Sequence, residues 1–176
     1  MRRTTALTYL IATALVAAGG ERAAAAQRLV DVQSVARDTL TDVAMTVYER
    51  GRPIIYYNPT LMQRLGPHLA EFFMAHEYGH VAYGHGGGAL SQPRDDLSSL
   101  RQRQELEADC YATRLLAQND RAAVEAALKF FTRMGPFRFD DLHPSGSQRA
   151  AKILACLPTT DRVSAAAGPG PDQPAE

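Results

Sequence analysis

The stretch that decides the fold is LAEFFMAHEYGHVAY, residues 69–83, a largely apolar run with a composition suited to a helix. It contains the pattern H-E-x-x-H at His76, Glu77 and His80. Residues i and i+4 project from one face of a helix, so the two histidines can bind one metal ion. Glu77 lies one residue round the helix and can act as general base on a metal-activated water. The alternative is a core helix with three polar groups, which would be costly to bury without partners.

A second helical segment, QELEADCYA at residues 104–112, can supply the third metal ligand. The metzincin pattern fails, because its glycine and histidine positions hold Tyr83 and Gly86. Glu105 and Asp109 are i and i+4 on this segment, so Glu105 can be a ligand while Asp109 accepts the outer N–H of a zinc-binding histidine. Small alanines on that face allow a close approach between the two helices. Taken alone, the segment also fits a solvated, charged helix face.

Together these motifs resemble the gluzincin metallopeptidases of the HtpX and CAAX-prenyl-endopeptidase type. The resemblance implies that Glu105 is the third zinc ligand and that Asp109 orients a zinc-binding histidine. A further family element, H-P followed by arginine, matches the segment from His143 to Arg149. It implies that His143 either steadies the oxyanion or caps the zinc in a resting state, with Arg149 nearby.

The resemblance covers residues 54–157 and departs from the family at two points. The segment from His80 to Glu105 is shorter than in the large members, and closer to the spacing in ImmA/IrrE-type and thermolysin-like enzymes, which use the same ligands. The chain also lacks the transmembrane helices of the membrane-embedded members. The substrate is therefore expected to be a peptide or protein, with no finer preference implied.

The first 26 residues have the features of a secretory signal peptide. Arg2 and Arg3 precede an apolar stretch at residues 6–18, and an A-x-A site lies at residues 23–26. The apolar stretch is shorter than the roughly 20 residues of a membrane span. We expect cleavage after Ala26, an exported protein that is periplasmic or secreted, and no stable membrane span after cleavage. An uncleaved N-terminal anchor is the alternative.

Composition limits the partners and the number of domains. The 176 residues suit one compact domain, here residues 27–157, and the Ala-, Gly- and Pro-rich residues 158–176 are expected to be a disordered tail. The chain has 19 basic and 19 acidic residues, and residues 1–26 hold three arginines and one glutamate. The remainder has 16 basic and 18 acidic residues, a formal charge of −2. Nothing in it indicates binding to nucleic acid, which calls for a basic patch.

The two cysteines, Cys110 and Cys156, can form a disulfide if the protein is exported to an oxidising compartment. A bridge would pin the last predicted helix to the helix of Glu105. Two free buried thiols are the alternative, because sequence alone does not fix the geometry.

The remaining patterns predict the scaffold. Residues 29–40 have apolar residues at helical spacing, while residues 42–48 alternate and residues 53–57 read as a second strand after a turn at Arg50-Gly51. An exposed edge of this hairpin can hold an extended peptide, although Tyr56 and Tyr57 can equally serve packing. Ser99 with Gln102, and Ser145 with Gln148, resemble capping boxes, and Asp120 can cap the helix between them.

We therefore expect an α+β, zincin-like fold that is mostly helical, with a small β-hairpin or sheet beside the active-site helix. The expected function is a zinc endopeptidase with one zinc ion per chain, held by His76, His80 and Glu105. Glu77 and His143 are the expected catalytic residues. The competing interpretation is a non-catalytic or latent zinc-binding envelope factor, in which His143 closes the metal site.

Overall fold

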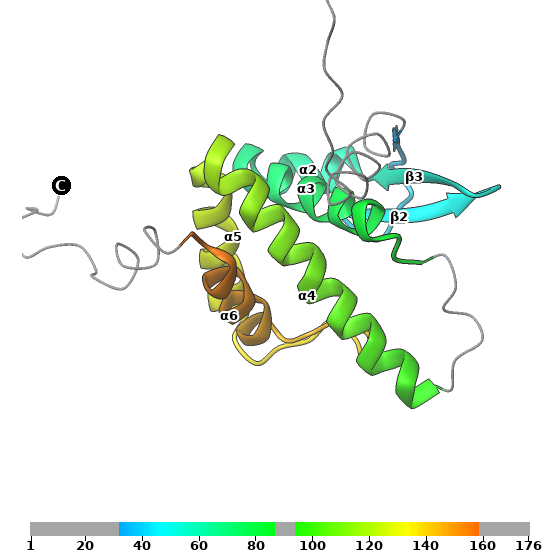
Figure 1. The fold of residues 1–176 in the computed structure, drawn as a ribbon. Helices are drawn as coiled ribbons and strands as arrows, with labels where there is room; N and C mark the ends of the chain where they lie inside the picture. The colour runs from blue at the N-terminus through cyan, green and yellow to red at the C-terminus, as the bar shows by residue number, and fades with distance from the viewer. Residues whose placement is uncertain (1–31, 87–93, 159–176) are drawn as a thin grey trace, which may run out of the picture.

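The computed structural model describes residues 32–86 and 94–158. In this part of the chain a small sheet lies beside a larger helical layer, which confirms the α+β prediction (Figure 1). The elements in chain order are β1 Gln33–Ala36, β2 Ala44–Glu49, β3 Arg52–Tyr57, α2 Pro59–Leu65, α3 Pro67–Tyr83, α4 Arg94–Asn119, α5 Arg121–Met134 and α6 Gly146–Cys156.

The sheet has the strand order β1-β3-β2. Strands β2 and β3 form the predicted antiparallel hairpin, with Thr46 opposite Ile55 and Glu49 opposite Arg52. Its turn residues, Arg50 and Gly51, both have positive φ, the conformation of two-residue hairpin turns that match the twist of the strands. Within the described residues β2 is therefore an edge strand, and it packs against α3.

The spacing of apolar residues at 29–40 predicted a helix, and this prediction is wrong for residues 32–40, the part of the segment that the structure describes. Residues 33–36 form β1, which pairs in parallel with β3 from Gln33 opposite Ile54 to Ala36 opposite Tyr57. A segment of four residues fits both the helical and the strand periodicity. Pairing with β3 favours the strand, because it satisfies the backbone hydrogen-bonding groups of these residues. Residues 29–31 of that prediction lie outside the described residues.

The central helix α3 begins and ends close to the predicted bounds. Gly66 precedes Pro67, which is at the first helical position, where its missing N–H is not needed. At the other end Gly84 adopts the left-handed conformation, with φ 67° and ψ 29°. The His85 N–H then donates to the His80 carbonyl oxygen at 2.9 Å, so the chain folds back over the last turn of the helix.

The long helix α4 begins earlier than predicted. It starts at Arg94 and runs through Ser99, so the capping box expected at Ser99 and Gln102 is wrong. Gln102 instead donates a hydrogen bond to the carbonyl oxygen of Asp141 at 2.8 Å. The other two caps are confirmed: Asp120 caps α5, and Ser145 forms a reciprocal capping box with Gln148 at the start of α6.

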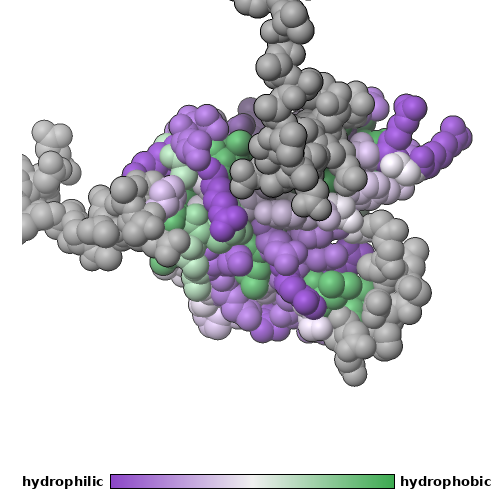
Figure 2. Space-filling model, in the orientation of Figure 1, coloured by the Kyte–Doolittle hydropathy of each residue, from purple (hydrophilic) through white to green (hydrophobic). Residues whose placement is uncertain are grey.

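The helices enclose the hydrophobic core. Helix α4 runs diagonally across the molecule in Figure 1, with the β2–β3 hairpin on one side and α5 and α6 on the other. Phe72 of α3 and Phe131 of α5 are fully buried, and their ring centroids lie 6.4 Å apart in an edge-to-face arrangement. The face in Figure 2 is mostly hydrophilic, with small hydrophobic patches, as expected of a domain that has buried its apolar side chains.

A disulfide joins Cys110 of α4 to Cys156 of α6, as the sequence predicted for an oxidising compartment, and their Cα atoms lie 5.3 Å apart. Cys110 directly follows Asp109, and both side chains are buried. The bridge therefore fixes α6 on α4 beside the candidate site, closing a loop with a sequence separation of 46 residues. A crosslink over such a loop stabilises a fold by roughly 4 kcal/mol through the entropy of the unfolded chain.

The ends of the chain carry predictions that lie outside the described residues. These are the signal peptide at residues 1–26 with its cleavage site, and residues 159–176 of the expected tail. Among the helices of the described ranges, none combines the length and apolar character needed to cross a membrane.

Candidate metal centre and active site

Two helices bring together the three predicted metal ligands. His76 and His80 lie one turn apart on α3, and Glu105 faces them from α4. One ligand atom from each of the three side chains lies within 4.8 Å of the other two. His76 is buried, whereas His80 and Glu105 are partly exposed, so the group is positioned by the core and reachable from solvent.

The spacing of these donors fits a tetrahedral zinc ion. The Nε2 atoms of His76 and His80 lie 3.1 Å apart, and the Glu105 carboxylate oxygens lie 3.1 Å from Nε2 of His76 and 3.3 Å from Nε2 of His80. Zinc ligands at about 2.0–2.2 Å from the metal in tetrahedral geometry are separated by roughly 3.3–3.6 Å. The donors therefore surround a point that could hold the ion after small adjustments.

The two helices approach closely because small residues lie between them. A Cβ atom added to Gly79, between the two histidines, would lie 2.9 Å from the Ala108 Cα atom and 3.1 Å from the Ala108 carbonyl oxygen. Ala108 and Ala112 are fully buried, as predicted for the small face of α4. Gly79 thus lets Glu105 reach the histidines of α3.

A buried ion pair orients His76. Its Nδ1 lies 2.9 Å from Asp109 Oδ1, and Asp109 receives two hydrogen bonds from Arg149 of α6, at 2.8 Å from Nε and 2.6 Å from a terminal nitrogen. A carboxylate only accepts, so His76 donates from Nδ1 and presents the Nε2 lone pair to the metal position. The structure thus brings Asp109 and Arg149 to the centre, where they neutralise each other.

The charges at the centre determine the protonation of His76. Burial alone would lower its pKa, but Glu105 and Asp109 raise it to about 10. Burial would likewise raise the pKa of Glu105, but the two histidines hold it well below its usual range. Without metal, His76 is therefore a cation between two carboxylates, and a bound metal ion would take the place of its Nε2 proton.

His80 is oriented by two residues that the sequence analysis did not assign to the site. Nδ1 of His80 lies 3.0 Å from Nδ1 of His85, and Nε2 of His85 lies 3.1 Å from Glu107 Oε2. Taken alone, the segment that contains Glu107 also fitted a solvated, charged helix face. Gly84 directly before His85 was the available signal, because a left-handed cap turns the next residue back toward the last helical turn.

Glu77, the predicted general base, contacts the edge strand of the sheet. Thr46 of β2 donates to Glu77 Oε2 at 2.7 Å and lies 3.1 Å from the Glu77 carbonyl oxygen. This contact fixes one carboxylate oxygen of Glu77, so the other, Oε1, is the one available for proton transfer. No local sequence signal marks Thr46, because its position depends on how the sheet packs against α3.

His143 lies on the loop between α5 and α6 and does not join the three ligands. Its Nδ1 pairs with Asp140 Oδ1 at 2.7 Å, and its side chain is 30% exposed. The hydrogen bond from Gln102 to Asp141 ties this loop to α4 one turn before Glu105. The latch that would close the metal site is therefore not formed, and the loop lies beside the helix that carries the third ligand.

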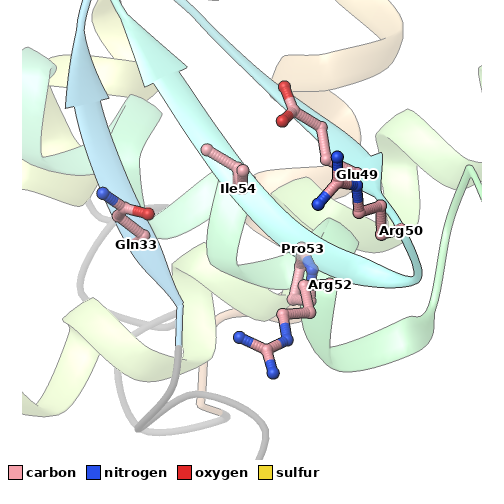
Figure 3. A pocket seen from close by; sticks show the side chains of 6 residues that line it. All are labelled: Gln33, Glu49, Arg50, Arg52, Pro53 and Ile54. Carbon is pink, nitrogen blue, oxygen red and sulfur yellow. The ribbon is translucent and has the colours of Figure 1, made fainter.

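A separate cavity of about 780 Å³ lies at the hairpin turn (Figure 3). Its lining residues are Gln33, Glu49, Arg50, Arg52, Pro53 and Ile54. The guanidinium groups of Arg50 and Arg52 point in different directions in Figure 3, so their charges do not converge on one ligand position. None of the metal-site side chains lines this cavity.

Comparison with known proteins gives one match. The model of a family described as Peptidase U49 matches residues 67–167, which is more than half of the chain and includes every predicted site residue from His76 to Arg149. No curated protein and no solved structure matches the chain. The match agrees with the peptidase part of the resemblance in the sequence, and it does not distinguish among the classes of metallopeptidase.

Proposed function

The chain belongs to the peptidase U49 family, and from this premise we propose that it is a zinc-dependent endopeptidase of the gluzincin type. Membership in the family supports proteolysis, with peptides or proteins as substrates. The observation that carries the finer proposal is the convergence of two imidazole nitrogens and one carboxylate at separations near those of tetrahedral zinc.

Zinc is the proposed metal because neutral imidazole and carboxylate donors suit it, and a set of three protein ligands is typical of catalytic sites. His76, His80 and Glu105 would hold it. When bound, the ion would supply Lewis acidity that activates water and polarises the scissile carbonyl group. Asp109 and His85 would keep the two Nε2 atoms turned toward it.

Glu77 performs the proton transfers in this proposal. Oε1 accepts a proton from the attacking water, and the resulting acid delivers it to the leaving amine as the peptide bond breaks. The Thr46 hydroxyl keeps the carboxylate in one orientation by bonding Oε2. A purely structural metal site has no use for a base held in this way, so this contact favours catalysis over the alternative of a non-catalytic envelope factor.

The substrate would bind in an extended conformation along β2. This strand is at the edge of the described sheet, and Thr46 on it contacts the proposed base. Backbone groups of an edge strand pair readily with an incoming peptide. Tyr56 is unavailable for contacts with substrate, because it is buried and donates to Glu49 Oε1 at 2.6 Å.

His143 is proposed to stabilise the oxyanion, with its loop moving toward the metal when substrate binds. The tie from this loop to Gln102 places it beside α4, one turn from Glu105. Asp140 accepts from Nδ1 in the present conformation, so Nε2 can donate to the oxyanion only when the ring carries a proton on both nitrogens. Its loss should lower turnover, because such donors act mainly in the transition state.

The test is hydrolysis of an unfolded protein by zinc-loaded variants. Glu77→Gln should retain zinc and thermal stability but lose activity by about 10²- to 10⁴-fold, the usual contribution of a general base. The matched control is Glu71→Gln, an exposed residue on the same helix, which should cleave at the rate of the unmodified protein. In the same assay His143→Ala should lower kcat at unchanged zinc content.

Two results would contradict the proposal. Full activity in zinc-loaded Glu77→Gln would remove the proposed base. A higher rate in His143→Ala would identify His143 as a latch and the chain as a latent protease.

A further inference from the structure

Beside the C-terminal end of α3, three side chains in contact with one another lead from the metal position to the protein surface. Its members are His80, His85 and Glu107, joined by contacts of 3.0 and 3.1 Å. His85 is buried, with 7% of its surface exposed, whereas the Glu107 side chain is 46% exposed. Burying a polar side chain has a cost unless it is hydrogen-bonded, and both ring nitrogens of His85 have a partner.

The protonation of this chain follows from its outer end. The Glu107 carboxylate only accepts hydrogen bonds, so Nε2 of His85 carries the proton that lies between them. A neutral His85 then has a lone pair on Nδ1, which faces Nδ1 of His80. His80 can then donate from Nδ1, which leaves its lone pair on Nε2 once a metal ion takes the place of a proton between Nε2 and the Glu105 carboxylate.

We propose that His85 and Glu107 form a relay that fixes His80 as its Nδ1–H tautomer and thereby positions Nε2 for the metal. His85 is a positioning residue in this account, not a ligand. The inference rests on the proposed zinc site and adds to it two residues that determine how one ligand is presented.

The two zinc-binding histidines are thus positioned in different ways. His76 donates directly to Asp109, which is fully buried and neutralised by Arg149. His80 reaches its carboxylate through a second imidazole that is held over the helix end by the Gly84 cap. Substitution at Glu107 leaves no buried charge unpaired, so this half of the site can be altered without disturbing the core.

The first test measures zinc affinity by competition with a chromophoric chelator. His85→Ala should weaken zinc binding by about 10- to 100-fold, the usual effect of losing such an outer partner. His85→Asn should restore most of the affinity, since its side-chain oxygen can accept from Nδ1 of His80. Glu107→Gln should weaken binding by a smaller factor, because an amide can pair with either tautomer of His85. His68→Ala, at an exposed position at the start of α3, is the control and should bind as the unmodified protein.

The second test reads the tautomers directly by ¹⁵N NMR of the histidine rings in zinc-loaded protein. His80 should show a protonated Nδ1, and His85 should show a protonated Nε2 with no metal bound to either nitrogen. Glu107→Gln should produce a mixture of His85 tautomers while the fold is unchanged. This measurement does not require peptidase activity, so it also applies if a variant is inactive.

Three results would overturn the relay: unmodified zinc affinity in His85→Ala, no recovery in His85→Asn, or a protonated Nδ1 on His85. Failure of the proposed function looks different. In that case the unmodified protein would not bind zinc, or zinc-loaded Glu77→Gln would remain active.

Discussion

At the scale of single residues, His76 is coupled to two carboxylates of the site. It lies between Glu105 at 3.1 Å and Asp109 at 2.9 Å, and these carboxylates raise its pKa to about 10 from the ordinary value of 6.5. In the metal-free protein, the proton on Nε2 therefore balances the buried negative charge of Glu105. Zinc would balance the same charge in the metal-loaded protein. Metal binding and proton release are consequently linked.

This coupling predicts how the stability of the metal-free protein depends on pH. Because the folded pKa of His76 lies above 6.5, its protonation contributes stability that is fully present below pH 6.5 and is lost as pH rises toward 10. The metal-free melting temperature should therefore fall from pH 6.5 to pH 9.5, and the increase caused by zinc should grow over the same range. Differential scanning calorimetry with and without zinc measures both.

The control is His76→Gln, whose metal-free form should lack this part of the slope. A zinc-induced increase in melting temperature that is constant across this pH range would show that His76 is not protonated in the metal-free site.

At the scale of elements, the site depends on how closely α3 and α4 pack. Gly79 faces Ala108, and no larger residue fits without moving one helix. The disulfide between Cys110 and Cys156 and the ion pair between Asp109 and Arg149 then fix α6 against α4. The positions of the three candidate metal ligands are thus set by residues outside that group.

Gly79→Ala tests this dependence. The added methyl group would lie 2.9 Å from backbone, so the helices must separate, at a typical overpacking cost of about 1–3 kcal/mol. Because Glu105 would move away from the histidines, zinc affinity should fall together with the free energy of unfolding. Chelator competition and urea denaturation measure the two quantities.

Glu71→Ala, at an exposed position on α3, serves as the control. It should change neither the zinc affinity nor the free energy of unfolding. Unchanged zinc affinity in Gly79→Ala would show that the close approach of the helices does not position the ligand.

How much of this could be predicted from the sequence depends on the range of each interaction. The spacing of His76 and His80, the pair Glu105 and Asp109, and the caps at Asp120 and Ser145 are local patterns, and the structure contains them as expected. Strand β1 was predicted as a helix, because its pairing with β3 is not visible in a four-residue pattern. Thr46 and Glu107 were not assigned to the site for the same reason: each acquires its role from a distant contact.

At the scale of the whole molecule, the disulfide bears on where the protein works. Such bonds persist in oxidising compartments, and the cysteines that form this one are buried in the domain. We propose on this basis, together with the features of residues 1–26, that the protein is exported to the periplasm or secreted. The domain would then be released with a new N-terminus near Gln27.

N-terminal sequencing of protein recovered from the cell envelope or medium tests the export proposal. The sequence should begin at or near Gln27, and Cys110 and Cys156 should resist alkylation in denatured protein until a reductant is added. Protein that retains Met1 and sediments with membranes would instead identify residues 1–26 as an anchor. Rapid labelling of both thiols without reductant would contradict the disulfide.

The central claim is that His76, His80 and Glu105 form one zinc site, and zinc content by mass spectrometry tests it most directly. The purified protein should carry about one zinc ion per chain, as a mononuclear site does. Glu105→Ala should lose most of that zinc during dialysis against a weak chelator, while the control Glu125→Ala, at an exposed position on α5, should keep it. A zinc-free unmodified protein after reconstitution, or full zinc occupancy in Glu105→Ala, would contradict the account.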